Sequence, residues 1–144
     1  MKAPRASVYR AFLDAESVKR WMVPDGMTSE VHAFEPKEGG SFRITLTYDS
    51  PTGTGKTTPN SDTFKGRFVE LIPDALVVQV IEFETEDAQL KGPMKVTIMI
   101  SDAEDGGTDV VAVHERLPAG LSAKDNEAGW KMSLGKLAKL LQTP

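Results

Sequence analysis

Hydrophobic and polar residues alternate with a period of two through the middle of the chain, between about residues 29 and 117. The alternation is clearest over 42–48, where apolar or aromatic residues are separated by Arg43, Thr45 and Thr47. This period is typical of a β-strand with one buried face. Turn-forming residues separate further segments of the same kind, so the sequence predicts six strands: 31–34, 42–48, 62–72, 76–84, 94–100 and 108–116.

Short turns join the predicted strands. Gly39-Gly40, Pro73-Asp74 and the run Asp105-Gly106-Gly107 lie between successive segments. Strands joined in this way, without helical crossovers, pair antiparallel. The segment 76–84 is apolar on both faces, so the pattern does not indicate which of its faces is buried.

Helical patterns lie at both ends of the chain. The first twenty residues predict helix, with Pro4 suited to a first turn and Asp14 to the N-cap of a second, short helix. Over 122–141, Trp130 and three leucines recur on one helical face. This long C-terminal helix is expected to cover one face of the sheet. The gap beneath it is either core or cavity.

Composition narrows the class of protein. The 144 residues carry a net charge of −4, with 40% hydrophobic residues, which is ordinary for one globular domain spanning 1–144. A sequence pI near 5.2 argues against a nucleic-acid partner. With no cysteine, no signal-peptide pattern and no apolar run of membrane-spanning length, the expected location is cytoplasmic, without membrane contact.

The sequence holds two histidines, His32 and His114. Neither has a second ligand at metal-binding spacing, so no metal or other cofactor is expected. His114 alternates with Val110 and Ala112 on a small or apolar face. If that face is buried, His114 is a titratable group beneath the C-terminal helix. It then serves either in proton transfer or as a structural histidine that bonds to a neighbour.

Glu70 is the second catalytic candidate. By strict alternation it shares a face with Phe64 and Phe68, where a carboxylate needs a partner or a raised pKa. It meets His114 or Arg43 across the sheet, or it lies in water at the strand end.

The segment 53–57, Gly-Thr-Gly-Lys-Thr, partly matches a phosphate-binding loop. That motif needs a further glycine at the position of Ser50 and a helix after the loop, and this sequence has neither. Segment 53–57 is therefore interpreted as part of a polar hairpin loop.

Several motifs, in order, resemble the activator of heat-shock protein 90 ATPase homologue family. This family, also labelled polyketide-cyclase-like, belongs to the SRPBCC (START-like) superfamily. The motifs span nearly the whole chain: APRASVYRAF (3–12), WMVP (21–24), EGGSFR (38–43), GRFVELIP (66–73), GT (107–108), His114, NE (126–127), GW (129–130) and SL (133–134).

The resemblance implies an α+β helix-grip (START-like) fold, in which a curved antiparallel sheet wraps around the long C-terminal helix. It also implies an apolar cavity between them that binds a hydrophobic small molecule. The residues that match the family's cavity lining are Phe42, Tyr48, Phe68, Met94, His114 and Trp130, with Trp21 near the entrance.

The family pattern has a seventh strand, which would precede Ala3-Pro4 and is truncated or missing here. Without it, two sheet edges are unpaired, which is a liability. We expect either that the true start lies upstream of Met1 or that another chain, as in a homodimer, fills or avoids the gap. The co-chaperone that names the family also has an extra N-terminal domain, which we expect this protein to lack, so the family name need not carry the co-chaperone's activity.

Three functions follow from this sequence. The favoured one is a small-molecule-binding protein without assigned catalysis. The second is a cyclase, dehydratase or hydrolase acting on a hydrophobic substrate, with His114 as general acid or base and Glu70 orienting it. The third is a chaperone-binding module that uses an exposed surface.

Overall fold

The computed structural model describes residues 1–50 and 55–142. Six strands form one antiparallel sheet in the order of the chain, with each strand hydrogen-bonded to the next. The strands are β1 (Met27–Phe34), β2 (Ser41–Tyr48), β3 (Ser61–Ile72), β4 (Leu76–Phe83), β5 (Met94–Asp102) and β6 (Thr108–Glu115). The six predicted strands are thus confirmed, with the first beginning four residues earlier than the pattern indicates.

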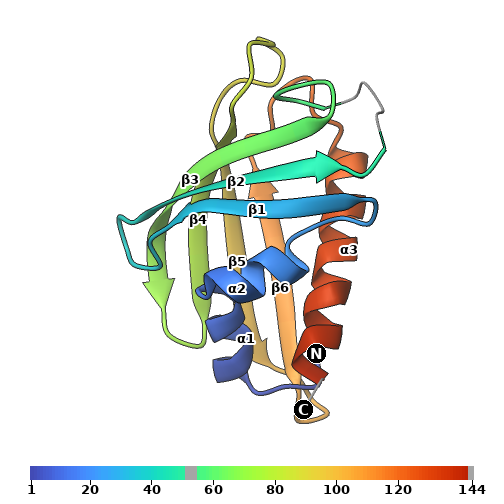
Figure 1. The fold of residues 1–144 in the computed structure, drawn as a ribbon. Coiled ribbons are helices and arrows are strands. Elements are labelled where there is room, and N and C mark those ends of the chain that lie inside the picture. The colour runs from blue at the N-terminus through green and yellow to red at the C-terminus, as the bar shows by residue number, and fades with distance from the viewer. Residues whose placement is uncertain (51–54, 143–144) are drawn as a thin grey trace.

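In the described part of the chain three helices accompany the sheet: α1 (Arg5–Phe12), α2 (Ala15–Trp21) and α3 (Ala123–Gln142). Asp14 is the N-cap of α2, because its carboxylate accepts a hydrogen bond from the Ser17 backbone N–H at 3.2 Å. β1 and β2 run crosswise to β5 and β6, and α3 runs alongside the curved sheet (Figure 1). This is the α+β helix-grip arrangement that the sequence predicts.

A β-bulge in β3 changes which side chains face the core. Phe68 pairs with Gln79 and Glu70 with Val78, so Val69 is an extra residue opposite no partner. An extra residue reverses the inward and outward alternation after it. Phe68 is therefore fully buried, whereas Glu70 is exposed. The expectation that Glu70 shares the inner face with Phe64 and Phe68 is wrong.

The start of the chain runs beside the first residue of β6. The Met1 ammonium donates to the carbonyl of Thr108 at 2.6 Å, and the Thr108 N–H donates to the carbonyl of Met1 at 2.8 Å. The buried Thr108 hydroxyl also donates to the carbonyl of Ala3. β1 and β6 are the two edges of the described sheet. Whether a further segment or a second chain pairs there stays a prediction.

Candidate functional site

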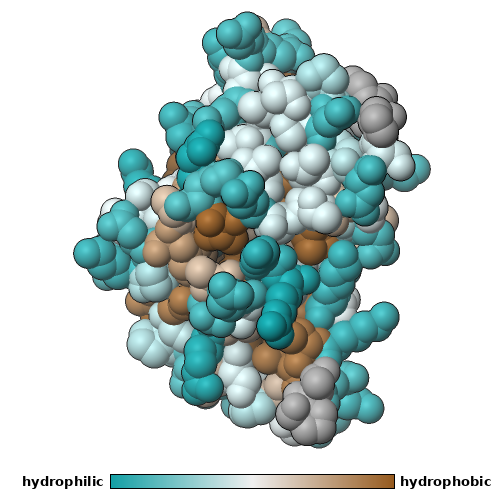
Figure 2. Space-filling model, viewed as in Figure 1, coloured by the Kyte–Doolittle hydropathy of each residue, from teal (hydrophilic) through white to brown (hydrophobic). Residues whose placement is uncertain are grey.

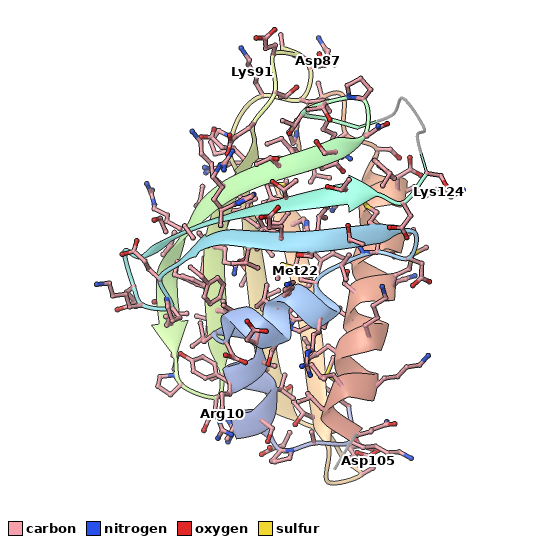
Figure 3. All side chains as sticks on the ribbon, in the orientation of Figure 1. Arg10, Met22, Asp87, Lys91, Asp105 and Lys124 are labelled. Atoms are coloured by element: carbon pink, nitrogen blue, oxygen red, sulfur yellow. The ribbon has the colours of Figure 1, made fainter. Side chains whose placement is uncertain are left out.

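A pocket of about 580 Å³ lies between the inner face of the sheet and the first half of α3. Apolar side chains from the five strands β1 to β5 line it, including Met27, Leu46, Phe64, Ile81 and Met94. α3 contributes the segment 125–133 in part, and the chain after α2 contributes Met22 and Pro24. Figure 3 shows the side chains of the sheet and helices, and places Met22 at the end of α2, close to β1.

His114 is held in the wall of this pocket by its strand. It lies on β6 opposite Val96, a fully buried residue of β5. Its imidazole Nδ1 lies 2.9 Å from the side-chain nitrogen Nδ2 of Asn126 on α3. Burial lowers the pKa of His114 below its ordinary value of 6.5. The imidazole is therefore neutral near pH 7.

Trp130 connects the pocket to the helices. Its ring meets the His114 ring edge-on, with centroids 4.8 Å apart, and meets Trp21 at 6.4 Å. Trp21 itself is fully buried, and its indole N–H donates to the carbonyl of Ala11 at 3.0 Å. The structure thus places Trp21 behind the pocket wall, not at an entrance, so that expectation needs correcting.

Four of the seven expected ligand-binding residues line the pocket: Tyr48, Met94, His114 and Trp130. Phe42 and Phe68 do not line it. Their rings pack against each other at 5.3 Å, and both pack against Phe34, within the aromatic core beside the pocket. They face inward as expected, but they lie further along the sheet than the pocket extends.

The two catalytic candidates are not brought together. Glu70 is exposed and absent from the pocket lining, whereas His114 lines it. Arg43, the other expected partner of Glu70, instead makes a two-pronged ion pair with Glu84 at 2.6 and 3.0 Å. This contact lowers the pKa of Glu84 through the hydrogen bond from Arg43.

Sequence reasoning missed a partly buried ion pair at the pocket. The carboxylate of Asp62, a residue that is 5% exposed, accepts from the Lys56 backbone N–H at 2.7 Å and from its Nζ at 3.1 Å. Both residues line the pocket, and Nζ also lies 5.3 Å from the centroid of the Phe83 ring. The signal for Asp62 was its position two residues before Phe64, on the same face of a strand.

Lys56 belongs to the segment considered as a phosphate-binding loop. Gly53 and Thr54 of that segment lie outside the described residues. Asn126 was also missed as a site residue. It precedes Trp130 by four residues, so one face of α3 presents both side chains to the pocket.

The sheet, the long helix and the pocket between them define a helix-grip protein. A family model described as activator of Hsp90 ATPase homolog 1-like protein matches residues 2–142, and the chain belongs to this family. Membership supports a helix-grip fold of the ligand-binding type. No curated protein matches the sequence.

Solved structures have the same fold. A crystal structure of a protein from Chromobacterium violaceum has a TM-score of 0.86 and 29% identity, covering 99% of this chain and 92% of that chain. A protein from Rhodobacter sphaeroides has a TM-score of 0.80 at 17% identity, covering 99% and 87%. One from Mycobacterium smegmatis has a TM-score of 0.77 at 14% identity, covering 100% and 87%.

The face of the molecule shown in Figure 2 is mostly polar or of intermediate hydropathy, with apolar areas between hydrophilic side chains. No helix within residues 1–50 and 55–142 has the length and apolar character needed to cross a membrane.

Proposed function

We propose that this protein binds a hydrophobic small molecule in the pocket between the sheet and α3. The observation that carries the proposal is the pocket itself, about 580 Å³ in volume and walled by apolar side chains of both layers. This volume is in the usual range for small-molecule sites. A few polar groups interrupt the apolar lining, among them His114 and Asn126. Such groups orient ligands in sites of this kind.

The arrangement favours binding over the enzymatic alternative. That alternative has Glu70 orienting His114, and Glu70 is exposed and lies outside the pocket. Nδ1 of His114 is instead contacted by an amide. An uncharged amide does not stabilise an imidazolium as a carboxylate does. Contact with a chaperone stays a prediction, which a pulldown with purified chaperone would test.

The experiment is a titration with an uncharged, largely apolar fluorophore that has no carbonyl group, a dimethylaminonaphthalene that carries a propyl group. Binding to the protein is followed by fluorescence anisotropy. We expect saturable binding to the wild type. The substitution Leu46→Trp should weaken it at least tenfold, because Leu46 lines the pocket and the larger side chain fills it.

The matched control is Val111→Trp. Val111 is 51% exposed on the outer face of β6, so the same new side chain lies away from the pocket. It should leave binding unchanged. Equal affinity in both variants would place the bound probe elsewhere on the protein, and no binding to the folded wild type would contradict the proposal.

A further inference from the structure

The contact between His114 and Asn126 indicates which chemical group the ligand presents to the pocket, and this inference rests on the proposed function. His114 Nδ1 lies 2.9 Å from Asn126 Nδ2, and both residues line the pocket. An amide nitrogen only donates hydrogen bonds, so Nδ1 of the imidazole accepts. A neutral imidazole that accepts at Nδ1 carries its proton on Nε2.

The Nε2–H group has no acceptor. Nε2 is buried, and within the part of the chain that the structure describes no group bonds to it. A buried donor without a partner destabilises the folded protein until a ligand or water accepts from it. The strand residues that line the pocket next to it, Met94 and Val96, are apolar. The strand wall beside His114 therefore offers the Nε2–H donor and no side chain that accepts from it.

The charged groups of the pocket indicate which kind of acceptor fits. Among the described residues, Asp25, Asp62 and Asp125 line it together with one cation, Lys56. Lys56 is paired with Asp62, and Asp25 is paired with Lys136 at 3.2 Å, so the lining offers an anionic ligand no unpaired cation and keeps the negative charge of Asp125. A carboxylate or phosphate on the ligand would be repelled by this negative charge. A neutral acceptor such as a carbonyl oxygen has no net charge and would not be repelled.

We infer that the natural ligand is an uncharged apolar molecule with a carbonyl or similar oxygen that accepts a hydrogen bond from Nε2 of His114. Asn126 is a positioning residue in this scheme, because it holds the imidazole in the form that donates from Nε2. His114 determines specificity for the ligand in this scheme.

A pair of shape-matched probes tests this inference. One is the propyl-substituted naphthalene used above, and the other carries a propionyl group, so they differ by one carbonyl oxygen. For the wild type we expect the ratio of propyl to propionyl dissociation constants to exceed that of His114→Phe by about tenfold. The phenyl ring keeps the edge-on contact with Trp130 but has no donor.

The outcomes separate the two proposals. If the propyl probe binds and the ratio is the same in both proteins, the pocket is a binding site but the donor role of His114 is wrong. If neither probe binds the wild type, the proposed function and this inference both fail. Failure of His114→Phe to bind the propyl probe moves the decision to the measurement below.

Nitrogen NMR of the imidazole of wild-type His114 is an independent test. We expect the proton on Nε2 and the unprotonated signal at Nδ1, and a shift of the Nε2–H resonance when the propionyl probe binds. A proton found on Nδ1 would mean that Asn126 presents its oxygen and that Nε2 is itself an acceptor. That result would overturn the inference.

Discussion

The ring of Phe42 packs directly onto the backbone of Gly66 on the neighbouring strand. The two residues pair across β2 and β3. A Cβ atom at position 66 would lie 2.6 Å from Cζ of Phe42 and 2.5 Å from the carbonyl oxygen of Val80. Gly66 therefore makes room for a ring of the aromatic core that borders the pocket.

We predict that Gly66→Ala lowers the free energy of unfolding by about 1–3 kcal/mol, as overpacked cores do. One of the two close contacts is to backbone, which yields less easily than a side chain. Urea denaturation of the variant and the wild type measures the difference. Unchanged stability would show that Phe42 moves aside freely.

The same substitution at Gly135 on α3 is a control, because it should raise the stability that Gly66→Ala lowers. It is exposed, and an added Cβ would meet nothing within 4 Å. Alanine favours a helix interior over glycine by about 0.8–1.0 kcal/mol. Gly135→Ala should therefore raise the urea midpoint, and a lowered midpoint would contradict the position of this residue on the helix.

The buried Trp21 holds the end of α1. Its indole N–H bonds to the carbonyl of Ala11, one of the last-turn carbonyls that lack a helical partner. Trp21→Phe removes this donor and leaves a smaller ring, so we expect a loss of about 2–4 kcal/mol. Thermal denaturation checks this value. A loss below about 1 kcal/mol would mean that water satisfies the carbonyl.

The lowered pKa of His114 makes stability depend on pH. The folded state disfavours the charged imidazole, because burial lowers the pKa of His114. Below the ordinary value of 6.5 the unfolded chain thus binds more protons than the folded one. The contribution of the neutral His114 to the free energy of unfolding is fully present above pH 6.5 and is lost as the pH falls toward the pKa of His114 in the folded state.

Melting temperatures at about pH 7.5 and about pH 5.5 test this dependence. The wild type should lose more stability than His114→Gln over this range, because the variant lacks the titrating group. His32 and the carboxylates are common to both proteins, so their effects cancel. An equal loss of stability in the wild type and in His114→Gln would contradict the burial of this histidine.

The substitution Asn126→Asp should raise the pKa of His114, since a carboxylate beside the imidazole favours the charged ring.

The Asp62–Lys56 pair should stabilise the hairpin that borders the pocket. Asp62→Asn leaves the ammonium without its charge partner, and we expect a loss of about 1–3 kcal/mol. This is less than the ~3–5 kcal/mol of a fully buried pair, because the Lys56 side chain stays 22% exposed. In the double variant Asp62→Asn/Lys56→Met the loss should be smaller than the sum of the two single losses. Strict additivity would show that the charges do not interact.

Local patterns were sufficient for the elements of this fold. The alternation over 42–48 and the helical spacing around Trp130 each follow from geometry that repeats within a few residues, so they predicted β2 and α3 closely. The turns at Pro73-Asp74 and Asp105-Gly106-Gly107 indicated the antiparallel order in the same way. Asp14 was predicted as a cap, and it caps α2.

The site depends on contacts between segments far apart in the chain, which periodicity does not contain. The bulge at Val69 turns Glu70 outward. Strand β4 is apolar on both faces, and the face with Val77 and Ile81 is buried because the residues of β5 that pair with them face the core. The sequence by itself determined the strands, the helices and the family. Only the tertiary structure decided that His114 meets Asn126, because this contact depends on how α3 lies across the sheet.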